Sequence, residues 1–246
     1  MPSHSVPADL TCSEASLCWP TMAVRFAIWF FVAMTVSMPP SFAQEEPTDR
    51  SLRIYAVNII QDPPQSWTGY GVYLGSGLVL TAAHVVGSAA RTRPSVRIAG
   101  LVLRATTVKE GAFEREDLTL LRVDERELPV GLRLRRMPVC QRQPWIGQPV
   151  IVAIPEGTAR SRIMSPQLLP AQYRARFSTV IGDVATTGNS GSGVFDAANK
   201  CLLGIMSRKI QVRPEGADPK SEFKDLAKYF VPAAAITAFI PSRYHF

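Results

Sequence analysis

The residues with the clearest capacity for chemistry lie in the segment TTGNSGSGVF, residues 186–195, where serine stands inside a glycine-rich turn. Glycine permits positive φ and close approach of another group to the backbone, so this composition predicts a tight turn rather than a flexible linker. The following segments VFD and CLLGIMS are typical of strands. Ser190 would lie at the tip of this turn, flanked by backbone amides, as a candidate nucleophile that requires an adjacent base.

Histidine is the side chain best suited to be that base, and the sequence offers three: His4, His84 and His245. His4 falls in a leader segment, and His245 is the penultimate residue, where chains usually fray. His84 follows the apolar segment VLTAA, which is typical of a strand. Taken alone, a histidine in this position is more often a hydrogen-bonded structural residue than a catalytic one, so a catalytic role depends on the other motifs of the sequence.

Three segments, VLTAAHVV, DLTLL and GNSGSGVF, follow one another along the chain and resemble the signature segments of the chymotrypsin/trypsin-like serine peptidases. The resemblance is closest to the bacterial trypsin-like branch with HtrA-like and glutamyl-endopeptidase-like enzymes. It implies that Ser190 is the nucleophile, that His84 transfers its proton, and that Asp117 orients the imidazole. It also implies an oxyanion hole formed by the backbone N–H groups of Gly188 and Ser190.

Within this resemblance, several positions depart from the digestive trypsin pattern. Asn189 stands where those enzymes carry an aspartate that pairs with a newly cut N-terminus, so we expect activity without proteolytic activation. Ser192 replaces a second glycine, as in the bacterial branch. Val184 falls at the base of the specificity pocket and suggests a small or medium apolar residue before the scissile bond. Ser207, also assigned to the pocket region, aligns with a serine that supports the catalytic aspartate; an ordinary strand-end serine is the alternative.

The elements that must position these residues are mostly short strands. The 20 prolines and 16 glycines divide the chain into short segments with few long helical periods, which favours an all-β fold. We expect a hairpin around Gly75–Gly77 and a short helix with one apolar face over 232–241. Strand-like segments lie at 53–60, 70–86, 95–110, 114–125, 147–157 and 175–183.

The family resemblance implies two packed antiparallel six-stranded β-barrels, with a short C-terminal helix. We place the first barrel at residues 44–128 and the second at 129–246. The first would supply His84 and Asp117, and the second would supply Ser190. Because the chain stops after the terminal helix, we expect no PDZ-like module.

Residues 1–43 are typical of a secretory signal peptide, with Arg25 before the apolar run 26–38 and small residues up to Ala43. The segment before Met22 is long for such a signal, so a start at Met22 or an uncleaved anchor is the alternative. The run is too short for a comfortable transmembrane helix. We therefore expect a secreted or periplasmic protein with no stable membrane span after cleavage.

Cys140 and Cys201 are the two cysteines that lie beyond the leader. In an oxidising compartment we expect them to form a disulfide; two buried free thiols are the alternative. The sequence has no cluster of histidine, cysteine and carboxylate residues at ligand spacing. We therefore expect no metal or organic cofactor.

The formal net charge of +7 could favour nucleic acid, but the basic residues are scattered and not interleaved with aromatic residues. We therefore expect polypeptide substrates, no nucleic-acid partner and a monomer. An α/β-hydrolase is disfavoured because its chain order, serine then acid then histidine, would require His245. The alternative to an endopeptidase is a catalytically silent binding module with the same fold.

Overall fold

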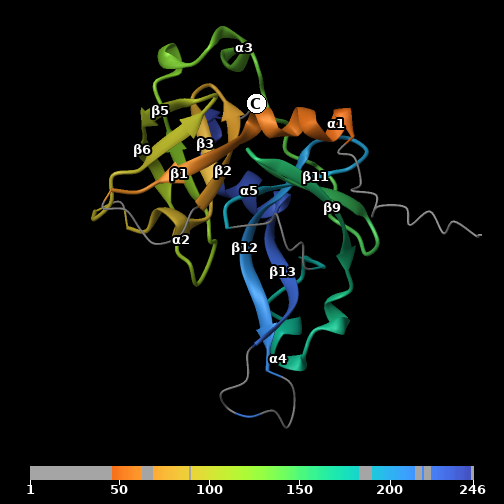
Figure 1. Cartoon of the computed structure of the whole chain (residues 1–246). Helices are drawn as coiled ribbons and strands as arrows, with labels where there is room; N and C mark the ends of the chain where they lie inside the picture. Colours follow the sequence, from red (N-terminus) through yellow and green to blue (C-terminus); the bar gives the residue numbers. More distant parts are fainter. Residues whose placement is uncertain are drawn as a thin grey trace, which may run out of the picture. The chain divides into compact units, whose positions relative to one another are not determined.

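The computed structural model describes residues 46–62, 69–88, 90–182, 190–213, 218 and 223–244. The expected signal peptide, Gly188 and Val184 lie outside these described residues. Within them, no helix combines the length and the apolar character that a membrane crossing requires. The described chain consists mainly of β-strands joined by short helices and turns (Figure 1).

The first sheet contains seven antiparallel strands in the order β5-β4-β1-β2-β3-β7-β6. The two edge strands, β5 and β6, are separated only by Ala105, so one bent segment pairs with β4 at one edge and with β7 at the other. Counted as a single bent strand, this segment gives the six strands expected for the first barrel. The bounds are β1 Ala56–Ile60, β2 Gly69–Gly75, β3 Leu78–Thr81, β4 Ser95–Ile98, β5 Leu101–Arg104, β6 Thr106–Glu110 and β7 Thr119–Arg122.

The second sheet is a closed six-stranded barrel in the order β10-β13-β12-β11-β8-β9. Its longest strands, β12 and β13, pair along most of their length and run side by side in Figure 1. The bounds are β8 Pro149–Ile154, β9 Gly157–Met164, β10 Val180–Ile181, β11 Gly193–Asp196, β12 Leu202–Val212 and β13 Lys224–Pro232. The expected boundary at residues 128–129 falls between the last strand of the first sheet and the first strand of the barrel, and it stays a prediction.

The helices are all short, because glycine, proline and turn residues interrupt the helical periods. The longest is α5, which is the expected C-terminal helix; it buries Ile236 and Phe239 on one face. The α-helices are α1 Pro47–Arg50, α2 Ala83–Val86, α3 Val130–Arg133, α4 Ala171–Arg174 and α5 Ala233–Phe239. The 3-10 helices are η1 Ser51–Tyr55, η2 Glu125–Glu127, η3 Pro166–Leu168 and η4 Ser242–Tyr244.

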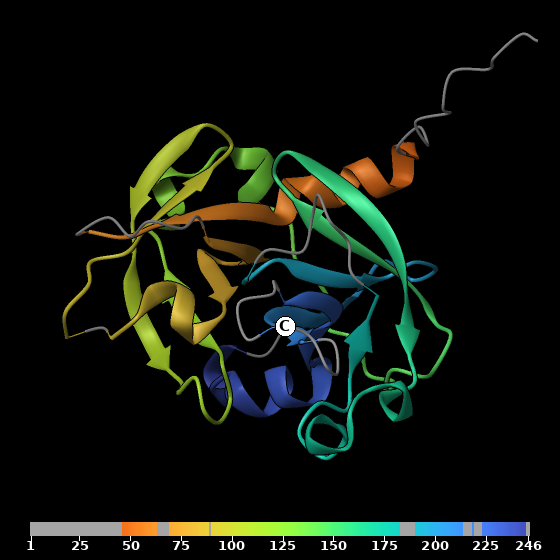
Figure 2. The ribbon, with the colours of Figure 1, turned by 60° about the horizontal axis from the view of Figure 1, so that its bottom comes forward.

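A shared apolar core joins the first sheet to the barrel. The largest buried cluster contains Leu80 of β3, Phe195 of β11 and Ile236 of α5, each fully buried. Figure 2 shows the first sheet, coloured orange to green, beside the green and blue strands of the barrel. The fold class expected from the sequence, an all-β chymotrypsin-like architecture with a short terminal helix, is confirmed.

Two expected strands are shorter in the structure than their local composition indicates. The expected strand 53–60 begins as the 3-10 helix η1 and becomes β1 only at Ala56. The expected strand 175–183 is reduced to the two residues of β10, after α4 and a turn in which Tyr173 packs near Phe177. Arg53 of η1 contacts Pro155, and Phe177 packs on Tyr229 of β13; such contacts with distant segments outweigh local strand propensity.

The N-terminal segment is fastened to the barrel by a buried carboxylate. Asp49 is only 2% exposed; its Oδ2 lies 2.6 Å from Nε of Arg160, and its Oδ1 lies 2.7 Å from Nζ of Lys200. We call these three residues the Asp49 cluster. Burial raises the pKa of Asp49, but hydrogen bonds from Arg160 and Lys200 outweigh it and lower the pKa. Arg53 also donates to the carbonyl oxygen of Pro155, so η1 is held against the barrel.

Candidate active site

His84 lies in the single turn of α2, directly after β3. The small residues Ala82 and Ala83 are buried, which lets the chain turn sharply from the strand into the helix. The His84 side chain is 26% exposed, so it combines a fixed backbone with access to solvent. A histidine in such a position can exchange protons with a bound molecule.

Asp117 is brought to His84 by the pairing of β7 with β3, in which Thr119 lies opposite Thr81. Its Oδ2 lies 2.8 Å from Nδ1 of His84, and its Oδ1 accepts a hydrogen bond of 3.1 Å from the His84 backbone N–H. An ionised carboxylate can only accept, so the Nδ1 nitrogen carries the proton in this contact. The other ring nitrogen, Nε2, is then the basic one.

Ser207 is the second side chain that holds Asp117. It lies in β12 at a point where the register against β13 shifts between Met206 and Arg208, and its hydroxyl donates to Oδ2 of Asp117 at 2.5 Å. Burial raises the pKa of Asp117, but hydrogen bonds from His84 and Ser207 outweigh it and hold the pKa below its ordinary value. The carboxylate therefore stays ionised although Asp117 is only 1% exposed.

Ser190 is held between the two sheets by its backbone. Its carbonyl oxygen accepts a hydrogen bond of 2.9 Å from the N–H of Tyr70 in β2, and the N–H of Gly191 donates to Met206 in β12 at 2.8 Å. Gly191 has φ +86°, and a Cβ there would collide with the backbone of Tyr70. Only glycine fits this position, and the turn composition indicated this need for glycine.

The Ser190 hydroxyl donates to the carbonyl oxygen of Ser207 at 3.4 Å. Ser207 therefore contacts Ser190 through its carbonyl and Asp117 through its hydroxyl. The structure thus brings His84, Asp117, Ser190 and Ser207 into one connected group at the junction of the first sheet and the barrel. Gly188 and Val184 are outside the described residues, so their geometry adds nothing to this group.

Sequence reasoning missed two further residues beside His84. The ring of Phe113 meets the imidazole edge to face, with centroids 5.2 Å apart and an interplanar angle of 71°. The guanidinium of Arg208 stacks on the Phe113 ring, and its central carbon lies 3.8 Å from the ring centroid. The position of Arg208 directly after Ser207 was an available signal, whereas nothing in the local pattern singles out Phe113.

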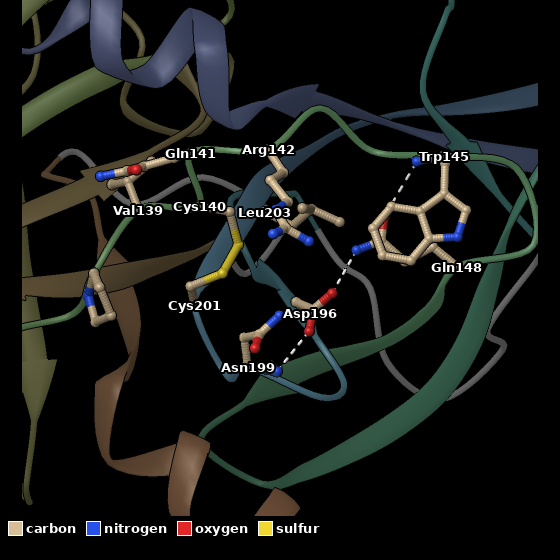
Figure 3. A pocket seen from close by; sticks show the side chains of 11 residues that line it. Val139, Cys140, Gln141, Arg142, Trp145, Gln148, Asp196, Asn199, Cys201 and Leu203 are labelled. Atoms are coloured by element: carbon tan, nitrogen blue, oxygen red, sulfur yellow. Dashed lines mark hydrogen bonds between the residues drawn. A yellow bond between two sulfur atoms is a disulfide. The ribbon is translucent and has the colours of Figure 1, made fainter.

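The expected disulfide between Cys140 and Cys201 is present in the structure. It lines a cavity of about 440 Å³ (Figure 3), and no residue of the group around His84 lines that cavity. The buried carboxylate in this cavity, Asp196, accepts hydrogen bonds from the side chain of Gln148 and from the N–H groups of Ala198 and Asn199. These polar groups satisfy one another, so their arrangement is that of a structural turn rather than a reactive site.

Residues 69–205 match the family model of the trypsin-like peptidase domain. The chain belongs to the trypsin-like peptidase family. The matched stretch contains His84, Asp117 and Ser190, and it spans strands of both sheets. In the described part of this trypsin-like peptidase, no three histidine, cysteine, aspartate or glutamate residues are grouped to hold a metal ion.

Solved structures of several serine peptidases are similar to this trypsin-like peptidase. The active form of the Rv3671c protease from M. tuberculosis is 18% identical, with a TM-score of 0.54 over 78% of this chain and 82% of that one. The serine endoprotease from Yersinia pestis is 21% identical, with a TM-score of 0.51 over 79% of this chain and 66% of that one. Kallikrein-related peptidase 10 in complex with Zn²⁺ is 20% identical, with a TM-score of 0.55 over 76% and 93%. These similarities establish the fold of this trypsin-like peptidase, and no curated relative matches its sequence.

Proposed function

We propose that this trypsin-like peptidase is an exported serine endopeptidase that cleaves peptide bonds through Ser190, His84 and Asp117. The observation that carries the proposal is the hydrogen-bonded series from His84 Nδ1 through Asp117 to Ser207, whose carbonyl contacts the Ser190 hydroxyl. A buried, ionised carboxylate that fixes the imidazole tautomer is the arrangement that a serine nucleophile needs.

In the proposed reaction, the Ser190 hydroxyl attacks the carbonyl carbon of the scissile bond while Nε2 of His84 takes the hydroxyl proton. His84 then delivers this proton to the leaving amine, and an acyl group remains on the serine. Water then attacks the acyl carbon while His84 takes one of its protons, the ester bond to Ser190 breaks, and His84 returns the proton to the Ser190 oxygen as the acid leaves. Asp117 stabilises the positive charge that forms on the imidazole in each half of the reaction.

In the proposed reaction, the Ser190 hydroxyl forms a hydrogen bond to Nε2 of His84. Its hydrogen bond to the Ser207 carbonyl is long, at 3.4 Å, and therefore weak. We infer that the hydroxyl exchanges this contact for one to His84 in the substrate complex, since catalytic hydrogen bonds commonly tighten only when substrate binds. We assign the oxyanion hole to the backbone N–H groups of Gly188 and Ser190, on the strength of the family resemblance.

The proposal also covers activation, cleavage preference, export and oligomeric state, which we infer mainly from the sequence. Asn189 offers no charge to a new N-terminus, so the enzyme acts without proteolytic activation. The family resemblance assigns Val184 and Ser207 to the specificity pocket, and the side chain of Val184 favours a small or medium apolar residue before the scissile bond. The signal-like residues 1–43 and the Cys140–Cys201 disulfide support export of a monomer that acts on polypeptides.

The test replaces one hydroxyl and compares it with a second buried hydroxyl two residues away. Ser190→Ala should lower turnover of a fluorogenic peptide library by a factor on the order of 10⁴ or more, with thermal stability almost unchanged. Ser192→Ala is the matched control, because Ser192 is buried and its hydroxyl has no hydrogen-bond partner in the described structure. Wild-type turnover by purified Ser190→Ala would refute the proposal. A wild-type protein without turnover, but with peptide binding, would instead support the silent binding module.

A further inference from the structure

Next to the imidazole, the structure holds a cation that the hydrolytic reaction itself does not require. The guanidinium of Arg208 stacks on the ring of Phe113 at 3.8 Å, and its Nη2 donates to the Phe113 carbonyl oxygen. Phe113 in turn contacts the His84 ring. Two different contacts to one residue fix the orientation of a side chain that is usually mobile, so the charge has a defined place beside the reacting groups.

Two neighbouring basic side chains pair with carboxylates, whereas Arg208 does not. Arg176 pairs with Glu114 at 2.7 Å, and Lys209 pairs with Asp225 at 2.7 Å. Across the described residues, Arg208 forms no ion pair with a carboxylate. The half-buried guanidinium of Arg208 is therefore available to a carboxylate of a bound molecule, because the ionised Asp117 carboxylate is already engaged by His84 and Ser207.

The strand that carries Arg208 also has a free edge where an extended chain can lie. β12 pairs with β11 only over Leu202–Ile205, although it continues on its other side along β13 to Val212. The backbone of the segment 207–212 is therefore open along one edge, in the described structure, to strand addition. Ser190 contacts the carbonyl of Ser207, so a substrate whose acyl group is joined to Ser190 would pass Arg208 with the residues before the cut.

We propose that Arg208, held by Phe113, makes this enzyme prefer substrates with an acidic side chain at the second or third residue on the N-terminal side of the cut. This inference rests on the proposed peptidase function and adds a substrate class to it. A carboxylate can accept the guanidinium hydrogen bonds that point away from Phe113, whereas a lysine or arginine at the same place is repelled. The two preferences concern different substrate residues, because the residue directly before the cut enters the pocket to which the family resemblance assigns Val184.

The experiment compares fluorogenic peptides that carry Glu, Gln or Lys at the second or the third position before the cleaved bond. For the wild type we expect kcat/KM to be roughly tenfold higher for Glu than for Gln at one of these positions, and the ratio to fall as salt is added. Arg208→Gln should bring the ratio to about one, and Arg208→Glu should reverse it in favour of Lys. Arg97→Gln, which removes the same charge from an exposed site on β4, should keep the wild-type ratio.

The outcomes separate this inference from the peptidase proposal. Cleavage by the wild type without a Glu preference, or with a preference that survives Arg208→Gln, overturns the role of Arg208 and leaves the peptidase function intact. If no peptide is cleaved, the peptidase function fails, and the same peptides with a fluorescent label are tested for binding by anisotropy. Binding of the Glu peptide that is unchanged by Arg208→Gln then overturns the inference as well, whereas a roughly tenfold weaker binding supports it.

Discussion

Removal of the Ser207 hydroxyl tests whether Asp117 is held for catalysis by the contacts described above. Ser207→Ala deletes one of three hydrogen bonds to the Asp117 carboxylate; both remaining bonds come from His84. Asp117 is 1% exposed, so water cannot readily replace the lost donor. A hydrogen bond to a buried charged group contributes about 1.5–3 kcal/mol. We expect a loss of about 2 kcal/mol in unfolding free energy and a decrease on the order of tenfold in kcat/KM.

The pH dependence gives this prediction a distinctive sign. The pKa of Asp117 is depressed in the folded protein, so its ionisation stabilises the fold above the ordinary pKa of 3.8, and this contribution disappears as the pH falls through the folded-state pKa. Ser207→Ala raises the folded-state pKa of Asp117 toward that of the unfolded chain. The difference in unfolding free energy between wild type and variant should therefore be largest at neutral pH and vanish in acid, where Asp117 is protonated in both proteins.

Urea unfolding at a series of pH values, with peptide turnover measured on the same samples, provides the assay. Ser192→Ala is the control, because it also truncates a buried serine but removes no hydrogen bond among the described residues. An equal loss of stability in both variants, or a Ser207→Ala difference that persists unchanged in acid, would refute the reasoning about Asp117.

Two further changes test how the scaffold is held together. Asp49→Asn breaks the Asp49 cluster and should lower the unfolding free energy by about 2 kcal/mol, so Tm falls by roughly 4–8 °C in calorimetry. The loss is smaller than for a fully buried ion pair because Arg160 is half exposed. Asp124→Asn, in an exposed ion pair, should leave Tm unchanged, and equal effects in the two variants would contradict the assigned role. Replacing Cys140 and Cys201 by alanine opens a loop that spans 61 residues and should lower the unfolding free energy by about 4 kcal/mol in urea titrations. An unchanged urea midpoint would contradict this expectation.

Three residues of the candidate site could be named from the sequence because each carries a local signal. Three short motifs contain His84, Asp117 and Ser190, and the glycine that must follow Ser190 belongs to the same motif as the serine. What the motifs do not contain is their spatial relationship. It depends on the antiparallel register of β3 and β7, which places Asp117 beside a histidine 33 residues earlier in the chain.

The features that sequence reasoning missed depend on contacts between distant residues. The Asp49 cluster joins residues that are 111 and 151 positions apart, and neither hydropathy nor spacing identifies such partners. Arg208 belongs to a scattered set of basic residues, so its place over Phe113 became visible only in the structure. The strand expected over 53–60 was wrong at its start, because the docking of η1 on the barrel outweighs local propensity.

The reactivity of Ser190 toward a fluorophosphonate probe reveals whether its hydroxyl and the His84 imidazole act as a pair. Intact-mass and peptide mapping of the native protein should find a single label on Ser190. The labelling rate should fall by at least 10³-fold in His84→Ala, and labelling should cease on heat unfolding. A native protein that stays unlabelled, or one that labels equally well without His84, would contradict the proposed activation of this serine.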